Sequence, residues 1–149
     1  MLAIQSDRIL TPLDIINKGR ILIENGKVVA IGPASDINIP DGTPVLDAAD
    51  KIIIPGLIDT HTHGRDGDYY GEDPSSTAEH TRSITSTGVT SFLPTLASLN
   101  AIPDTLEVIL NRIKTVRQVM LQDPGGAEIL GIHMEGPFLS KEDTARGSQ

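Results

Sequence analysis

Short β-branched runs separated by turn residues dominate the first third of the chain. Two such runs, Arg20 to Glu24 and Lys27 to Ile31, flank the pair Asn25-Gly26. This pair predicts a type I′ hairpin, because both central residues of that turn need positive φ. Gly32-Pro33 ends the second run, and Val45 to Asp47 is a third short strand candidate. These strands are too few to enclose a core, so we expect a small sheet that is completed from elsewhere.

After Pro55-Gly56 the pattern changes to alternating strands and helices. Leu57 to His61 is predicted as a strand, and Val89 to Leu93 as the next one. Between them, the spacing predicts a helix over Ser75 to Thr87, with Ser75 or Ser76 as its N-cap and Gly88 as its end. The chain from residue 55 onward therefore differs in architecture from residues 1–54.

The clearest periodicity follows Pro103, a residue that is tolerated at the first position of a helix. Apolar side chains then recur at helical spacing: Leu106, Ile109, Leu110, Ile113, Val116 and Met120. Pro124-Gly125-Gly126 stops this helix, and Glu128 to Met134 is predicted as a third strand. Strand, helix, strand, helix, strand implies right-handed βαβ units and a parallel sheet.

Composition limits what the chain can bind. The 149 residues carry a net charge of -8 without a Lys/Arg cluster, which argues against binding of nucleic acid. No apolar run approaches the roughly 20 residues of a membrane helix, and the first residues do not form a secretory signal. We therefore expect no membrane partner and a cytoplasmic location. Because the chain has no cysteine, any metal ion must be held by histidine and carboxylate.

Three side chains with that chemistry stand at predicted strand ends. His61 and His63 end the first strand and lie on the same side of it, and Glu135 ends the third. In a parallel sheet these ends share the C-terminal rim, where α/β barrels place their active sites. Imidazole nitrogens and a carboxylate suit zinc, iron or a similar divalent ion, which would activate water for hydrolysis. We therefore predict His61, His63 and Glu135 as metal ligands.

Other polar residues near this rim leave alternatives open. His133 shares a face with Glu135 and is equally consistent with a ligand, with an outer partner of a ligand and with a core residue. Asp59 either orients His61 or serves as a buried or capping group. His80, inside a predicted helix, is interpreted as a surface residue. Arg65 to Asp73 resembles a loop at an active site, but a solvent-exposed loop is the preferred interpretation.

Two segments carry a family resemblance. Ile21 to Gly32 followed by Pro55 to Gly64 (Pro-Gly-Leu-Ile-Asp-Thr-His-Thr-His-Gly) resembles the opening of the metal-dependent amidohydrolase superfamily. Gly131 to Ser140 (Gly-Ile-His-Met-Glu-Gly-Pro-Phe-Leu-Ser) is similar to N-acetylglucosamine-6-phosphate deacetylases within it. The resemblance covers about Arg20 to Ser140. It implies a (β/α)8 barrel with a small β-sandwich that removes acetate from N-acetylglucosamine 6-phosphate with the help of one or two divalent ions.

The resemblance also implies roles for single residues. His61 and His63 match the histidine pair of the first strand, and Glu135 matches the metal-binding glutamate. Ser148 matches a position that helps to bind substrate, although Gln149 replaces the histidine that usually follows it. Family members also use two later histidines as ligands and a late aspartate as general acid/base. This sequence contains no counterpart of those residues, so its catalytic residue is unknown.

The size of a barrel limits this interpretation. A closed barrel takes about 250 residues and eight strands, whereas only about 95 residues follow Pro55. We therefore expect residues 55–149 to form the first three β/α units of an incomplete (β/α)8 barrel, preceded by β-sandwich strands in residues 1–54. An open strand edge and uncovered apolar faces would favour homo-oligomers. As the N-terminal portion of a larger enzyme, the chain by itself is expected to show no deacetylase turnover.

Two alternatives remain open at this stage. The chain is also consistent with another amidohydrolase, dihydroorotase-like or cytosine-deaminase-like, in which later strands supply a different ligand set. Alternatively, it is a catalytically dead remnant or an interaction module that keeps its motifs by descent. A bound metal ion that is lost with the histidine pair would separate an enzyme part from a remnant.

Overall fold

The computed structural model describes residues 1–65, 68–97, 105–135 and 142. The chain divides into two compact units, Met1–Pro55 and Gly56–Gln149. In the described residues the first unit contains strands and the second combines strands with helices, so the chain has a mixed α/β fold. No helix in the described ranges has both the length and the apolar character that a bilayer crossing requires.

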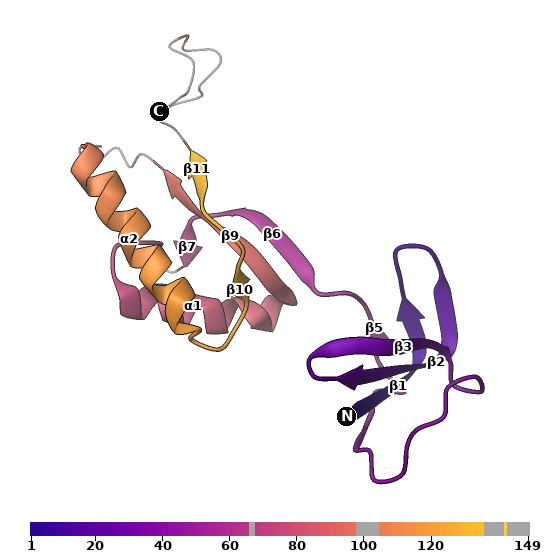
Figure 1. Cartoon of the computed structure of the whole chain (residues 1–149). Coiled ribbons are helices and arrows are strands. Elements are labelled where there is room, and N and C mark those ends of the chain that lie inside the picture. Colours follow the sequence, from indigo (N-terminus) through magenta and orange to yellow (C-terminus); the bar gives the residue numbers. More distant parts are fainter. Residues whose placement is uncertain (66–67, 98–104, 136–141, 143–149) are drawn as a thin grey trace. The chain divides into compact units, whose positions relative to one another are not determined.

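The first unit is a single five-stranded sheet (Figure 1). Its strands are β1 (Leu2–Leu10), β2 (Ile15–Glu24), β3 (Lys27–Pro33), β4 (Val45–Asp47) and β5 (Ile52–Ile53). The order is β3-β2-β1-β4, and β5 also pairs with β1. β1 pairs antiparallel with β2 and parallel with both β4 and β5. The sequence pattern had not singled out β1, which is the strand that connects the others.

The predicted hairpin turn is confirmed. Asn25 and Gly26 both have positive φ, at 50° and 74°, and Glu24 pairs with Lys27 across the turn. The buried apolar side chains of this unit come from β1 and β2: Ala3, Ile9, Ile21 and Leu22. Val28, Val29 and Ile31 of β3 are exposed. Within the described residues, this sheet therefore leaves apolar side chains uncovered.

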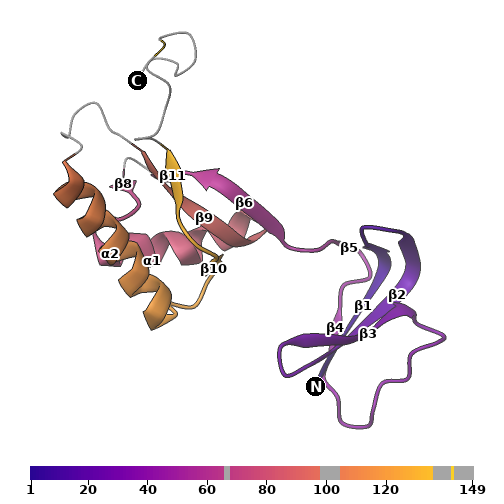
Figure 2. The same cartoon turned by 45° about the horizontal axis from the view of Figure 1, so that its top comes forward.

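The second unit is built on a parallel sheet, as predicted. Its strands are β6 (Leu57–Thr62), β9 (Val89–Ala97), β10 (Glu128–Ile129) and β11 (His133–Glu135). β9 is central, because β6, β10 and β11 all pair with it in parallel. Two helices, α1 (Pro74–Ser83) and α2 (Leu106–Gln122), cover one face of the sheet (Figures 1 and 2). A short antiparallel pair, β7 (Gly64–Arg65) and β8 (Asp68–Tyr69), follows β6.

The third predicted strand is wrong in one respect. Glu128 to Met134 does not form one continuous strand but two short ones, β10 and β11, separated by Leu130 to Ile132. Leu130 donates its N–H to Phe92 O at 3.0 Å, so this interruption still follows β9. Both parts pair with β9, and Glu135 remains at the carboxyl end.

The first helix starts from a different cap than predicted. Asp73, not Ser75 or Ser76, is the N-cap of α1, since its carboxylate accepts the Ser76 N–H at 2.8 Å. The α-helix ends at Ser83 and continues as a 3-10 turn, η1 (Ile84–Thr87). Gly88 closes this turn in the left-handed conformation, as predicted. Asp73 also places a negative charge at the positive end of the helix dipole, which is a favourable position for it.

The second helix begins at Leu106, with Thr105 as its N-cap, and Pro103 lies outside the described residues. It packs on the sheet mainly through Val116 and Val119, whereas Leu106 is 72% exposed. The core of this unit is one cluster of buried side chains: Tyr70, Val89, Phe92, Leu96, Val116, Val119, Ala127 and Ile129. This cluster fixes β9 against the helices and so sets the platform on which the flanking strands lie.

Candidate metal centre

A bulge in β6 shapes the segment that carries the two histidines. Asp59 pairs with Phe92 of β9, but Thr62 pairs with Pro94, so β6 has one residue more than β9 over the same stretch. Such a bulge breaks the regular ladder and re-aims the side chains that follow it. The carboxylate of Asp59 accepts the His61 N–H at 3.0 Å, and the hydroxyl of Thr95 accepts the Thr62 N–H, also at 3.0 Å. The backbone N–H groups of His61 and Thr62 in the bulge are thus both bonded to side chains.

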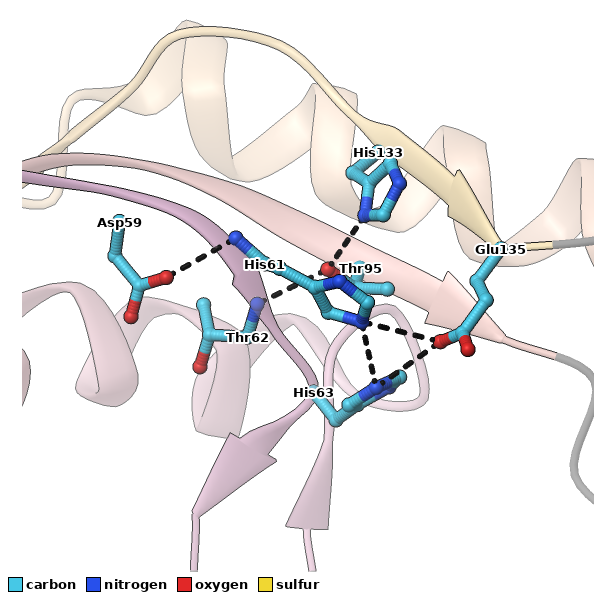
Figure 3. Close-up of polar contacts among 7 residues, drawn as sticks. All are labelled: Asp59, His61, Thr62, His63, Thr95, His133 and Glu135. Atoms are coloured by element: carbon cyan, nitrogen blue, oxygen red, sulfur yellow. Dashed lines mark hydrogen bonds and ion pairs between the residues drawn. The ribbon is translucent and has the colours of Figure 1, made fainter. Parts of the chain in front are cut away.

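Glu135 reaches the same place from the other side of β9. It is the last residue of β11 and pairs with Ala97 near the carboxyl end of β9. β6 and β11 therefore lie on either side of β9, and their polar ends meet at one rim. Figure 3 shows His61, His63 and Glu135 turned toward one another there.

The three donor atoms form a nearly equilateral triangle. His61 Nε2 lies 3.2 Å from His63 Nε2 and 3.2 Å from Glu135 Oε2, and His63 Nε2 lies 3.1 Å from that same oxygen. Two donors at about 2.0–2.1 Å from a shared ion are separated by about 2.9 Å in octahedral and about 3.3 Å in tetrahedral geometry. The observed edges fall between these values. The triangle therefore has the size of one face of a first-row metal coordination sphere.

Hydrogen bonds alone do not satisfy this triangle. A neutral imidazole carries its proton on one of its two nitrogens, and an ionised carboxylate only accepts. If only one of the two Nε2 atoms is protonated, the other Nε2 directs its lone pair at a lone pair of the Glu135 carboxylate. If both are protonated, their two N–H groups face each other. A divalent cation satisfies all three contacts at once, and these are the three described residues that converge as a His/Glu metal site.

His133 lies beside this triangle but is not part of it. Its ring packs edge-on against His61, with centroids 4.7 Å apart and an interplanar angle of 69°. Its Nδ1 is 3.1 Å from the hydroxyl of Thr95 and therefore bonds to β9. The structure places His133 as an outer partner of the predicted ligands, which is one of the roles that the sequence left open.

Asp59 acts on the backbone and not on an imidazole ring. Its bond to the His61 N–H spans two residues and stabilises the bulge, so it orients His61 only through the main chain. Ser148 lies outside the described residues, and its predicted role in substrate binding stays a prediction.

A buried tyrosine underlies the site. Tyr70, 2% exposed, directly follows β8 and packs against Phe92 at 5.4 Å between ring centroids. Burial raises the pKa of Tyr70, a hydrogen bond with Thr62 lowers it, and the negative charge of Asp59 raises it further; the net shift is upward. The preferred interpretation of Arg65 to Asp73 as a solvent-exposed loop is therefore wrong at Tyr70, which is a core residue.

The prediction for His80 is also wrong. His80 is only 7% exposed, and its ring packs edge-on against Tyr70 at 5.2 Å. Together with Thr77 and Thr81 it forms the buried face of α1. All three are polar, so hydrophobic periodicity gave no signal for this face.

Comparison with known proteins gives a consistent picture. No family model matches the chain. The chain is 31% identical over 144 residues to the N-acetylglucosamine-6-phosphate deacetylase of Bacillus subtilis. This alignment covers 93% of the chain and 35% of the relative. A dihydroorotase of Syntrophus aciditrophicus, from the same superfamily, is 35% identical over 95 residues and covers 64% of the chain.

The fold leads to the same family. The crystal structure of N-acetylglucosamine-6-phosphate deacetylase from Pasteurella multocida superposes with a TM-score of 0.76 at 25% identity. The match covers 99% of this chain and 39% of that structure, so the chain spans little more than a third of the length of these relatives. In sequence and in fold, the chain corresponds to the N-terminal portion of the N-acetylglucosamine-6-phosphate deacetylases of the amidohydrolase superfamily.

Proposed function

We propose that this chain supplies part of the metal site of an N-acetylglucosamine-6-phosphate deacetylase. Such an enzyme hydrolyses the acetamide C–N bond of an amino-sugar phosphate and releases acetate and glucosamine 6-phosphate. The observation that carries the proposal is the convergence of His61, His63 and Glu135 within 3.2 Å of one another. The relatives named above support the choice of reaction.

The metal is proposed to be zinc or iron, present as one or two ions. Two nitrogens and one carboxylate oxygen suit these first-row cations, and the single negative charge of Glu135 partly offsets the charge of a divalent ion. When bound, such an ion supplies a polarised substrate carbonyl and a water of lowered pKa. His61, His63 and Glu135 would hold the ion, and Asp59 and Thr95 fix the bulge that presents His61.

The same comparison supports a proposal for the finer architecture. We propose that residues 55–149 are the first part of a (β/α)8 barrel and that residues 1–54 are strands of a small β-sandwich. In a barrel the carboxyl ends of the strands carry the active site, and the three proposed ligands lie at such ends. Ser148 is proposed to contribute to substrate binding.

Metal analysis of the purified chain tests the proposal. We expect stoichiometric zinc or iron after dialysis, and its loss in the double variant His61→Ala, His63→Ala. Glu128→Gln, a change of charge at an exposed position of β10, is the control and keeps the metal. A wild-type chain that holds no metal under conditions where it is folded contradicts the proposal and favours a remnant.

Turnover is expected only in a longer protein. The chain covers 35% of the Bacillus subtilis deacetylase, and we propose that further ligands and the general acid/base come from the part that is not matched. The chain alone should therefore release no acetate from N-acetylglucosamine 6-phosphate. Acetate release that a chelator abolishes would overturn this point.

The match to a dihydroorotase, at 35% identity over 95 residues, makes hydrolysis of dihydroorotate a second candidate reaction. A chimera in which this chain replaces the matching segment of the Bacillus subtilis deacetylase separates the two. Acetate release from N-acetylglucosamine 6-phosphate supports the deacetylase. A folded, metal-loaded chimera that hydrolyses dihydroorotate instead would favour the alternative.

Self-association is proposed from exposed apolar side chains. Leu57 and Ile58 on β6 are 49% and 62% exposed, and Leu121 on α2 is 79% exposed. Exposed apolar residues beside an unpaired strand edge favour association between copies. Sedimentation at several protein concentrations tests this, and a monomer at all concentrations would contradict it.

A further inference from the structure

The central strand β9 separates the two strands that carry the proposed ligands, and one of its side chains contacts both neighbours. Thr95, 2% exposed, pairs with His133 in the β11 ladder. Its hydroxyl accepts the Thr62 N–H of β6 at 3.0 Å and lies 3.1 Å from His133 Nδ1 of β11 (Figure 3). One hydroxyl group therefore connects the bulge before His63 with the strand that ends in Glu135.

Counting hydrogens assigns the direction of the second bond. A threonine hydroxyl has one hydrogen to donate and two lone pairs to accept with. The Thr62 N–H is a donor, so it uses a lone pair of Thr95. The hydroxyl hydrogen still needs an acceptor at this buried position, and His133 Nδ1 is the acceptor within reach among the described residues, so we infer that Thr95 donates to it. The neutral ring of His133 consequently carries its proton on Nε2.

This tautomer determines what His133 contributes to the site. With Nδ1 bonded to Thr95 and Nε2 protonated, the neutral ring has no lone pair left for a metal ion. Its edge-on contact with His61, at 4.7 Å between centroids, still restricts how the His61 ring turns. His133 thus supports a ligand without competing for the ion.

We propose that Thr95 is a positioning residue for the candidate metal centre: its hydroxyl fixes the β6 bulge and the tautomer of His133, and thereby holds His61, His63 and Glu135 in place. This inference rests on the proposed function, because it assigns Thr95 to the same site. Outer partners of this kind change metal affinity by roughly 10- to 100-fold when they are removed.

Three substitutions test the role of the hydroxyl. Thr95→Val keeps the shape but removes the hydroxyl, Thr95→Ser keeps the hydroxyl, and Thr90→Val makes the same exchange elsewhere on β9. Zinc affinity is measured on the full chain by competition with a chromophoric chelator. We expect Thr95→Val to bind zinc about 10- to 100-fold more weakly, with Thr95→Ser and Thr90→Val close to wild type.

A second measurement needs neither metal nor a variant of Thr95. Long-range proton–nitrogen NMR spectra of the metal-free wild type report which imidazole nitrogen is protonated, and loss of signals in His133→Gln assigns His133. We expect the Nε2–H form. An Nδ1–H form overturns the inference, even if Thr95→Val fails to fold.

The outcomes separate this inference from the function on which it rests. If wild type binds zinc and Thr95→Val binds it equally well, the role of Thr95 is wrong and the metal site stands. If wild type binds no metal, the proposed function fails and the role of Thr95 with it.

Discussion

His61 Nε2 and Glu135 Oε2 lie 3.2 Å apart, although 74 positions of sequence separate the two residues. The parallel sheet accounts for most of this approach, since both residues lie at the carboxyl ends of strands that pair with β9. The bulge in β6 accounts for the rest, because it changes the register between Asp59 and Thr62. The extra residue in β6 lies directly beside His61 and thus contributes to how the imidazoles meet the carboxylate.

Removing the charge of Glu135 is expected to weaken metal binding while keeping the fold. Glu135→Gln retains the shape of the side chain but offers a neutral oxygen in place of a carboxylate. Because Glu135 is a proposed ligand, its loss should cost at least the roughly 10- to 100-fold in zinc affinity that an outer partner costs. Chelator competition measures the affinity. Glu128→Gln, at an exposed position of β10, is the matched control, and equal affinities of the two variants would contradict the prediction.

Alkaline pH is expected to destabilise the second unit through Tyr70. Burial raises the pKa of Tyr70 above its ordinary value of 10.0, so the folded state favours the uncharged phenol. This contribution to stability is complete below that ordinary value and is lost as the pH rises through the raised pKa. The chain has two tyrosines and no tryptophan, so tyrosinate absorbance of Tyr69→Phe reports Tyr70 alone. A midpoint at or below 10.0 in the folded variant would refute the shift.

Loss of the cap of α1 should lower stability measurably. Asp73→Ala removes the carboxylate that accepts the Ser76 N–H, and the expected cost is about 0.5–2 kcal/mol in the free energy of unfolding. Both tyrosines lie in the second unit, so tyrosine fluorescence during urea unfolding reports this unit. Ser75→Ala, an exposed serine in the first turn, should stay within about 0.5 kcal/mol of wild type. Equal effects of both variants would argue against Asp73 as the cap.

Two glycines with positive φ offer a matched pair for packing. Gly125 has φ of 69° with nothing near an added Cβ, whereas a Cβ on Gly71, at φ of 84°, would lie 2.9 Å from Arg112 Cβ. Gly125→Ala should cost about 1–2 kcal/mol of unfolding free energy for the backbone alone. Gly71→Ala adds overpacking against α2, a further cost of about 1–3 kcal/mol. Urea unfolding followed by tyrosine fluorescence measures both, and a smaller loss for Gly71→Ala would contradict the described packing.

Local sequence signals predicted much of this fold. Asn25-Gly26 identified its hairpin because few residue pairs accept two positive φ angles. The alternation of strands and helices after Pro55 predicted the parallel sheet. That topology also explains why His61, His63 and Glu135 lie together, since the carboxyl ends of parallel strands share a rim.

Features that depend on tertiary contacts were not predictable in this way. His80 is buried because Tyr70 packs on it, and nothing in the polar sequence of α1 indicates that contact. The interruption between β10 and β11 depends on their pairing with β9, as does the bulge in β6. The bond from Thr95 to His133 spans 38 residues, a distance at which no local pattern links two polar side chains.

The shortness of β11 gives the proposed site a role in local stability. This strand has three residues, and each of them pairs with a residue of β9. β6 is longer, with six residues. A ligand that binds the native arrangement stabilises whatever must be ordered to form it. A cation bridging the histidine pair and Glu135 would therefore stabilise β11 against local opening, and protection of the β11 amides from hydrogen exchange would rise with the concentration of free metal.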